Sequence, residues 1–189
     1  MDSAAPADAD QGSPHEAADE PSGRRSRHIT PQELVQGVNH VAVSVSDIAT
    51  SIEFYQRFFG LELLARQPAI ESIPGMAMVA GYPAETLHGS WALLAAGPIN
   101  LELVSYRSPL GITSGPRRPA DRGLAHLAFR VTDVDEMYRR LVDADVSTIS
   151  APAELGRDRA FYAHGPDGEL IEVLERDDAE PPLAEVLKP

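Results

Sequence analysis

The chain has 189 residues, a formal net charge of −13, 43% hydrophobic residues and no cysteine. Such a length predicts one compact domain or two small packed halves. The negative charge disfavours nucleic acid and anionic membranes as partners, and the lack of cysteine excludes disulfides and thiolate chemistry. No apolar run reaches the roughly 20 residues of a membrane span, and the N-terminus lacks the pattern of a secretory signal. We therefore expect a cytoplasmic protein.

The two ends of the chain differ in composition from the middle. Residues 1–30 are polar, acidic and poor in aromatic residues, which predicts a disordered tail. His15 and His28 lie there, and we assign them no role. Residues 177–189 are again acidic and rich in proline, which predicts a C-terminal tail.

An internal repeat is the main feature of the middle. Residues 39–48 (NHVAVSVSDI) align with residues 125–134 (AHLAFRVTDV), and each copy continues into a helical pattern, over 48–59 and 134–144. Ser46 and Thr132 are the expected helix N-caps, each followed by an aspartate in the first turn. Gly60 is the expected left-handed end of the first helix.

Both copies also end alike. Residues 100–104 (NLELV) match residues 170–174 (LIEVL), and each predicts a short strand with one acidic residue among apolar ones. The intervening residues predict two more strands per copy, near 61–69 and 91–96 in the first and near 146–150 and 159–163 in the second. Residues 166–168 predict a tight turn. Each half, 37–110 and 120–176, therefore reads as β-α-β-β-β, an α+β fold.

The first copy carries an insertion at residues 73–90, which contains several glycines and a proline. It predicts either a loop or lid near a site or a plain surface excursion. His88 lies in this insertion and His164 lies beside the predicted turn. We expect both histidines to be exposed.

Four polar residues stand in otherwise apolar strands. Alternation along a strand places His40 and His126 on the face opposite their apolar neighbours, and Glu102 and Glu172 are placed likewise. If the two halves pair about a pseudo-twofold axis, these faces form one concave sheet. Two imidazoles and two carboxylates there suit one divalent ion such as Zn, Ni, Co, Mn or Fe, with positions left open for substrate oxygens. A lone strand histidine is usually structural, but the repetition favours a shared metal site.

Three motifs carry a resemblance to a known family: residues 39–43 (NHVAV), 54–61 (FYQRFFGL) and 165–172 (GPDGELIE). Over about residues 37–176 the chain resembles the vicinal oxygen chelate superfamily, which includes glyoxalase I, methylmalonyl-CoA epimerase and extradiol dioxygenases. The resemblance implies paired modules forming a cup-shaped mixed sheet, with His40, Glu102, His126 and Glu172 as metal ligands. It also implies a homodimer, with each cup built within one chain or between two.

The His/Glu/His/Glu set resembles the glyoxalase and epimerase branches. This implies isomerase or lyase chemistry on a small carbonyl substrate, through a metal-stabilised enolate or enediolate. Glu172 is then the first candidate for the catalytic base and Glu102 the second. Tyr106, Arg130 and Trp91 are the expected substrate-binding residues, although Trp91, like Tyr162, fits the core equally well.

Other reactions of the superfamily stay open. An extradiol Fe(II) dioxygenase needs only His40, His126 and Glu172 as ligands. Glu102 as a fourth ligand therefore distinguishes an isomerase or lyase from a dioxygenase. Thiol transfer of the fosfomycin-resistance type is disfavoured for the same reason, and because no basic cluster for a phosphonate is evident. A small-molecule-binding resistance protein without activity is the other alternative.

Overall fold

The computed structural model describes residues 30, 34–71, 74–112, 115–156 and 158–176. The chain divides into two compact units, residues 1–37 and residues 38–189, and all the elements described below lie in the second. The predicted tails fall outside the described residues, Thr30 excepted. Among the helices that the structure describes, none has the length and apolar character needed to cross a membrane.

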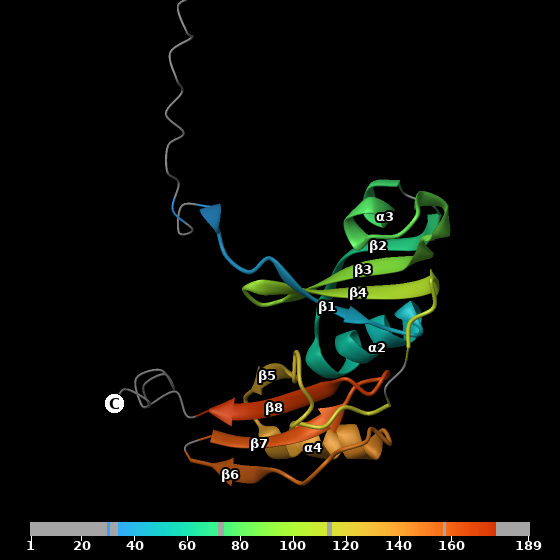
Figure 1. Cartoon of the computed structure of the whole chain (residues 1–189). Helices are drawn as coiled ribbons and strands as arrows, with labels where there is room; N and C mark the ends of the chain where they lie inside the picture. The colour runs from blue at the N-terminus through green and yellow to red at the C-terminus, as the bar shows by residue number, and fades with distance from the viewer. Residues whose placement is uncertain (1–29, 31–33, 72–73, 113–114, 157, 177–189) are drawn as a thin grey trace, which may run out of the picture. The chain divides into compact units, whose positions relative to one another are not determined.

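The second unit contains two β-α-β-β-β modules (Figure 1). The first consists of β1 (His40–Ser44), α2 (Ile48–Phe59), β2 (Glu62–Glu71), β3 (His88–Ala96) and β4 (Ile99–Ser108), with α3 (Pro74–Ala80) and the 3-10 turn η1 (Ala84–Thr86) between β2 and β3. The second consists of β5 (Leu127–Val131), α4 (Val134–Asp143), β6 (Ala153–Leu155), β7 (Asp158–His164) and β8 (Leu170–Arg176). The predicted α+β class and the repeated module are confirmed.

Each module forms its own four-stranded mixed sheet. The strand orders are β1-β4-β3-β2 and β5-β8-β7-β6, so the first and last strands of each module are neighbours. These neighbours run parallel, while the other pairs are antiparallel. The described residues therefore form two sheets where the sequence allowed one continuous concave sheet, and β1 and β5 are edge strands.

The two modules share one hydrophobic core. Tyr55 of α2 and Leu141 of α4 belong to it, together with inward-facing residues of both sheets such as Leu103 and Val173. The ring of Phe59 at the end of α2 also stacks on Phe129 of β5, with 4.2 Å between ring centroids. Because the modules pack through their helix-covered faces, the opposite face of each sheet is left outward. Exposure accordingly alternates along β1 and β5.

The helix starts differ from the prediction. The N-caps are the aspartates Asp47 and Asp133, not Ser46 and Thr132, and their carboxylates accept hydrogen bonds from the amides of Thr50 and Glu136. An aspartate in extended conformation can satisfy one of the free amides of the first turn by itself. The bond from the Thr50 amide holds the pKa of Asp47 below its usual value. Gly60 ends α2 with φ 65°, as predicted.

Two segments were predicted incorrectly. Residues 146–150 form no strand; they contribute only an isolated bridge between Thr148 and Ala163, and the third strand of the module is β6. Pro152, which lacks an amide hydrogen, separates that bridge from β6. The insertion is a folded part of the module, since α3 and η1 form a second small core around Ile70, Ala77 and Leu87.

Candidate functional site

His40 and Glu102 form a pair on the outward face of the first sheet. His40 begins β1, and Glu102 lies on the neighbouring β4 opposite Ala42. The small alanine leaves room for the carboxylate, and Oε2 of Glu102 lies 3.2 Å from Nε2 of His40. The other ring nitrogen, Nδ1, lies 2.8 Å from Oδ1 of Asn39, an acceptor that favours the proton on Nδ1. The lone pair of Nε2 then points to the side of Glu102.

The second module repeats this arrangement. His126 directly precedes β5, and Glu172 lies on β8 opposite Ala128. Oε2 of Glu172 lies 3.3 Å from Nε2 of His126. The pair is somewhat less exposed than the first: the side chains of His126 and Glu172 are 33% and 14% exposed, against 41% and 21% for His40 and Glu102.

Both pairs have the chemistry of metal ligands. Around one ion with bonds of about 2.1 Å, neighbouring donor atoms lie about 3.0 Å apart at a right angle and about 3.4 Å apart at a tetrahedral angle. The separations of 3.2 and 3.3 Å fall within this range. An imidazole nitrogen beside a carboxylate oxygen suits a borderline divalent ion. Each pair therefore fits as half of a metal site.

The two pairs do not meet within this chain. Among the residues that the structure describes, no group of three or more metal-binding side chains comes together. The reason lies in the packing of the modules, because the shared core turns the two outward faces away from the helices. The structure thus brings His40 to Glu102 and His126 to Glu172, but it does not bring the two pairs together within one chain, where the sequence predicted all four residues around one ion.

An aromatic side chain lies beside each glutamate. The indole of Trp91 on β3 donates a hydrogen bond to Oε1 of Glu102. In the second module Tyr162 of β7 is the strand partner of Glu172, and its ring packs edge-on against His126 with 5.5 Å between ring centroids. Burial and the nearby carboxylate raise the pKa of Tyr162. From the sequence alone, Trp91 and Tyr162 could belong either to the substrate-binding cup or to the hydrophobic core.

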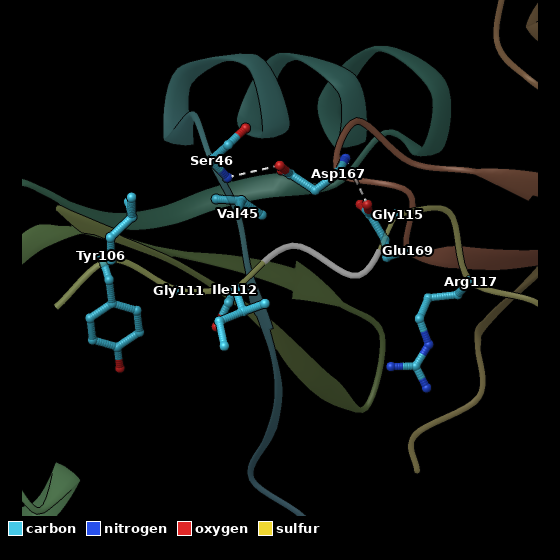
Figure 2. A pocket seen from close by; sticks show the side chains of 11 residues that line it. Val45, Ser46, Tyr106, Gly111, Ile112, Gly115, Arg117, Asp167 and Glu169 are labelled. Carbon is cyan, nitrogen blue, oxygen red and sulfur yellow. Dashed lines mark hydrogen bonds between the residues drawn. The ribbon is translucent and has the colours of Figure 1, made fainter. Parts of the chain in front are cut away.

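The other predicted substrate-binding residues are spread over both modules. Tyr106 shares the face and strand of Glu102 and lines a cavity of about 340 Å³, together with Ser44, Arg117 and Glu169 (Figure 2). Arg130 is exposed on β5, in the second module. The chain alone therefore does not gather Tyr106, Arg130 and Trp91 at one point, and their contact with substrate stays a prediction.

The turn before β8 joins the modules beside this cavity. The hydroxyl of Tyr55 in α2 donates to Oε1 of Glu169 at 2.6 Å, and the amide of Ser46 donates to Oδ1 of Asp167 at 3.0 Å. Burial raises the pKa of the Glu169 carboxyl. The sequence predicted the turn but not these contacts. The sequence features that could have indicated the contact were Tyr55, a polar-tipped residue in the apolar stripe of α2, and Glu169, an acidic residue directly after the turn.

The two other histidines in the described part of the chain, His88 and His164, are half-buried, contrary to the prediction. Nδ1 of His88, at the start of β3, lies 2.8 Å from a carboxylate oxygen of Glu71. Nε2 of His164 lies 3.0 Å from the carbonyl oxygen of Arg117. Both have local structural partners and lie outside the two His–Glu pairs.

Comparison with known proteins gives a consistent result. The sequence profile of the Glyoxalase/Bleomycin resistance protein/Dioxygenase superfamily matches residues 37–173. The chain is 32% identical to a 2-epi-5-epi-valiolone epimerase from Actinomyces over 72% of its length and 78% of that protein, and 28% identical to metallothiol transferase FosB from Lysinibacillus sphaericus over 73% and 81%. It is 27% identical to glyoxalase I of Saccharomyces cerevisiae, but spans only 44% of that protein.

Solved structures agree on the fold. A glyoxalase family protein from Bacillus cereus superimposes with a TM-score of 0.65 at 23% identity, covering 75% of this chain and 94% of the other. At this identity the likeness concerns the fold alone.

Proposed function

Because the chain belongs to the Glyoxalase/Bleomycin resistance protein/Dioxygenase superfamily, we propose that it is a divalent-metal enzyme that moves a proton beside the carbonyl of a small substrate. The reaction class is isomerase or lyase. The observation that carries the proposal is the pair of equivalent half-sites, each with an imidazole nitrogen and a carboxylate oxygen at the spacing of neighbouring ligands.

The complete site requires two chains in this proposal. A divalent ion of this kind takes at least four ligands, and each half-site supplies two. In a twofold homodimer the His40–Glu102 half-site of one protomer meets the His126–Glu172 half-site of its partner. Twofold symmetry then creates two identical sites. The exposed faces of the edge strands β1 and β5 support this assembly, because each carries or adjoins one half-site.

The four residues would hold one Zn, Ni, Co, Mn or Fe ion, whose two positive charges the two carboxylates balance. When bound, such an ion supplies Lewis-acid polarisation of a substrate carbonyl. Protein ligands from both half-sites also fix the position of the carboxylates relative to the substrate.

Glu172 is the proposed base. It is the less exposed of the two glutamates, and excluding water from a carboxylate favours proton transfer to it. Glu172 takes the proton from the carbon beside the carbonyl and returns it to that carbon or to a neighbouring atom. Tyr162, the strand partner of Glu172 on β7, would orient the carboxylate.

Glu102 favours this reaction over ring-cleaving oxygenation. It lies beside His40 just as Glu172 lies beside His126, so both halves offer the same donors. A fourth protein ligand occupies a position that a catechol or dioxygen would need. The names of the epimerase and glyoxalase I relatives agree with proton transfer, whereas that of FosB indicates thiol transfer. The experiment below therefore tests for thiol transfer as well as for proton transfer.

The substrate extends along the first sheet in this proposal. Tyr106 lies four residues beyond Glu102 on the same strand face, about 13 Å away at strand spacing, and lines the 340 Å³ cavity. We propose that Tyr106 contacts the part of the substrate remote from the carbonyl. Arg130 would act in the second module, on the same strand face as His126 and four residues beyond it. The cytoplasmic location stays a prediction.

Metal content and isotope exchange test the proposal. The protein is purified without chelators, its metal is quantified, and it is incubated in D₂O with cyclic hydroxyketones and with thiol adducts of 2-oxoaldehydes. Deuterium uptake at the carbon beside the carbonyl, dependent on added metal, is expected. Oxygen uptake with catechols, thiol addition to an epoxide, or a protein that binds no divalent ion would contradict it.

A further inference from the structure

We propose that Trp91 is a positioning residue that holds Glu102 as a one-oxygen metal ligand, an inference that rests on the proposed metal site. The strand partner of Trp91 is Val104, so the indole lies diagonally across from Glu102 on the same outward face. Long aromatic side chains reach such diagonal neighbours. The indole nitrogen does so, and donates to Oε1 of Glu102.

This hydrogen bond gives the two carboxylate oxygens different roles. Oε1 accepts from the indole, while Oε2 lies 3.2 Å from Nε2 of His40. An indole N–H can only donate, so it cannot exchange its role with the carboxylate. Oε2 is therefore the oxygen available to a metal ion on the side of His40.

The insertion in the first module anchors the indole. Trp91 packs against Ile70, Ala77 and Leu87, the small core that α3 and η1 complete. The second module has no such insertion, and there the aromatic residue opposite Glu172 is Tyr162. A phenol hydroxyl both donates and accepts, so it can follow a carboxylate that changes its partners. Glu102 is thus the fixed glutamate and Glu172 the adaptable one.

Tryptophan analogues test this directly, because Trp91 is the only tryptophan of the chain. Replacing tryptophan by benzothienylalanine during expression puts sulfur in place of the N–H with little change in ring size. 5-Fluorotryptophan keeps the N–H and serves as the matched control. Zn²⁺ affinity of each full-length protein is measured by competition with a chromogenic chelator, and Tm is measured alongside.

We expect the benzothienylalanine protein to bind Zn²⁺ about 10-fold or more weakly than the 5-fluorotryptophan protein, as is usual when a hydrogen bond to a metal ligand is lost. In addition, Co²⁺ should shift the fluorine resonance of the control as it binds. Equal Zn²⁺ affinity of the two proteins would overturn the inference.

Adding E102A separates the hydrogen bond from packing. In that background the two analogues should bind Zn²⁺ equally, because the side chain that accepts from the indole is gone. A difference that persists in E102A would assign the effect to ring packing and overturn the inference while leaving the proposed function intact. If the unmodified protein binds neither Zn²⁺ nor Co²⁺, the proposed function itself fails.

Discussion

At the scale of single residues, the proposal distinguishes two glutamates that the sequence presents as equivalents. We expect E172Q to lower deuterium exchange on a substrate by about 10²- to 10⁴-fold, because a general base contributes that much. Metal binding should only weaken, since the amide oxygen of glutamine remains a possible ligand. Exchange measured by NMR at saturating metal provides the test.

The matched control for this prediction is E102Q. It should lose metal affinity while keeping most of its exchange rate once metal is saturating. Exchange retained in E172Q and lost in E102Q would reverse the two roles.

A buried carboxyl makes the junction of the modules sensitive to pH. Burial raises the pKa of Glu169 above its ordinary 4.5, with Tyr55 as hydrogen-bond donor and Asp167 as the nearby charge. Its contribution to stability is therefore complete below pH 4.5 and decreases as the pH rises through the raised pKa. E169Q removes this titration, because its amide can accept from the Asp167 amide and donate to the Tyr55 oxygen.

We expect the Tm of E169Q relative to wild type to increase as the pH rises above about 4.5, and to be constant below it. Thermal melts of both proteins across this pH range measure the difference in Tm. The contributions of the other titrating groups are nearly the same in both proteins and largely cancel in that difference. A Tm difference that does not change with pH would mean that Glu169 titrates normally.

The sequence predicted the strand face of each of the four residues, because strand alternation depends only on neighbours along the chain. His40 and Glu102 each interrupt an apolar run, and the repeat marks their equivalents His126 and Glu172. The positions of Trp91 and Tyr162 beside the two glutamates depend on the register between β3 and β4 and between β7 and β8. No pattern along a single strand specifies that register.

At the scale of elements, the insertion depends on close contact between β3 and β4. A Cβ at Gly89 would lie 2.3 Å from the backbone oxygen of Ser105, which cannot move aside as a side chain could. G89A should therefore destabilise the protein by about 1–3 kcal/mol. Because β3 carries Trp91, we also expect weaker Zn²⁺ binding.

Gly75 in α3 provides the control, since no atom within 4 Å would meet its Cβ. G75A should leave stability unchanged or raise it by up to about 1 kcal/mol, because alanine is the better helix former. Denaturant melts compare the two variants. A neutral G89A would show that β3 and β4 can separate without cost.

Helices and strands whose apolar residues recur with a clear period were predicted well, whereas those without such a periodicity were not. The apolar stripe and Gly60 placed α2 at residues 48–59, as observed. By contrast, α3 has only seven residues and begins with Pro74 and Gly75, so no helical periodicity could be recognised in a segment whose composition predicts a loop. β6 has three exposed residues, and its position depends on pairing with β7 rather than on its own pattern.

At the scale of the whole molecule, the sequence could not decide between one cup within a chain and two cups shared by a dimer. The strands have the same alternation in both arrangements. What decides is which faces the modules bury against each other, and here the helix-covered faces share the core. The two His–Glu pairs consequently lie apart among the described residues, so the proposed metal site would need a second chain to complete it.

Mixing two inactive variants tests this requirement. The first variant, H40A/E102Q, has lost one half-site, and the second, H126A/E172Q, has lost the other. In a dimer that shares its sites between chains, each heterodimer contains one site built only from altered halves and one built only from intact halves. A site contained within one chain would be damaged in every molecule.

Random exchange of equal amounts should therefore restore about a quarter of the wild-type Zn²⁺ capacity, since half of the dimers are mixed and each has one intact site of two. Neither variant alone should bind Zn²⁺ tightly. Equilibrium dialysis before and after reversible unfolding of the mixture measures the recovery, and light scattering gives the mass of the dimer. No recovery in a mixture that contains heterodimers would show that the four residues do not form a site across the two chains.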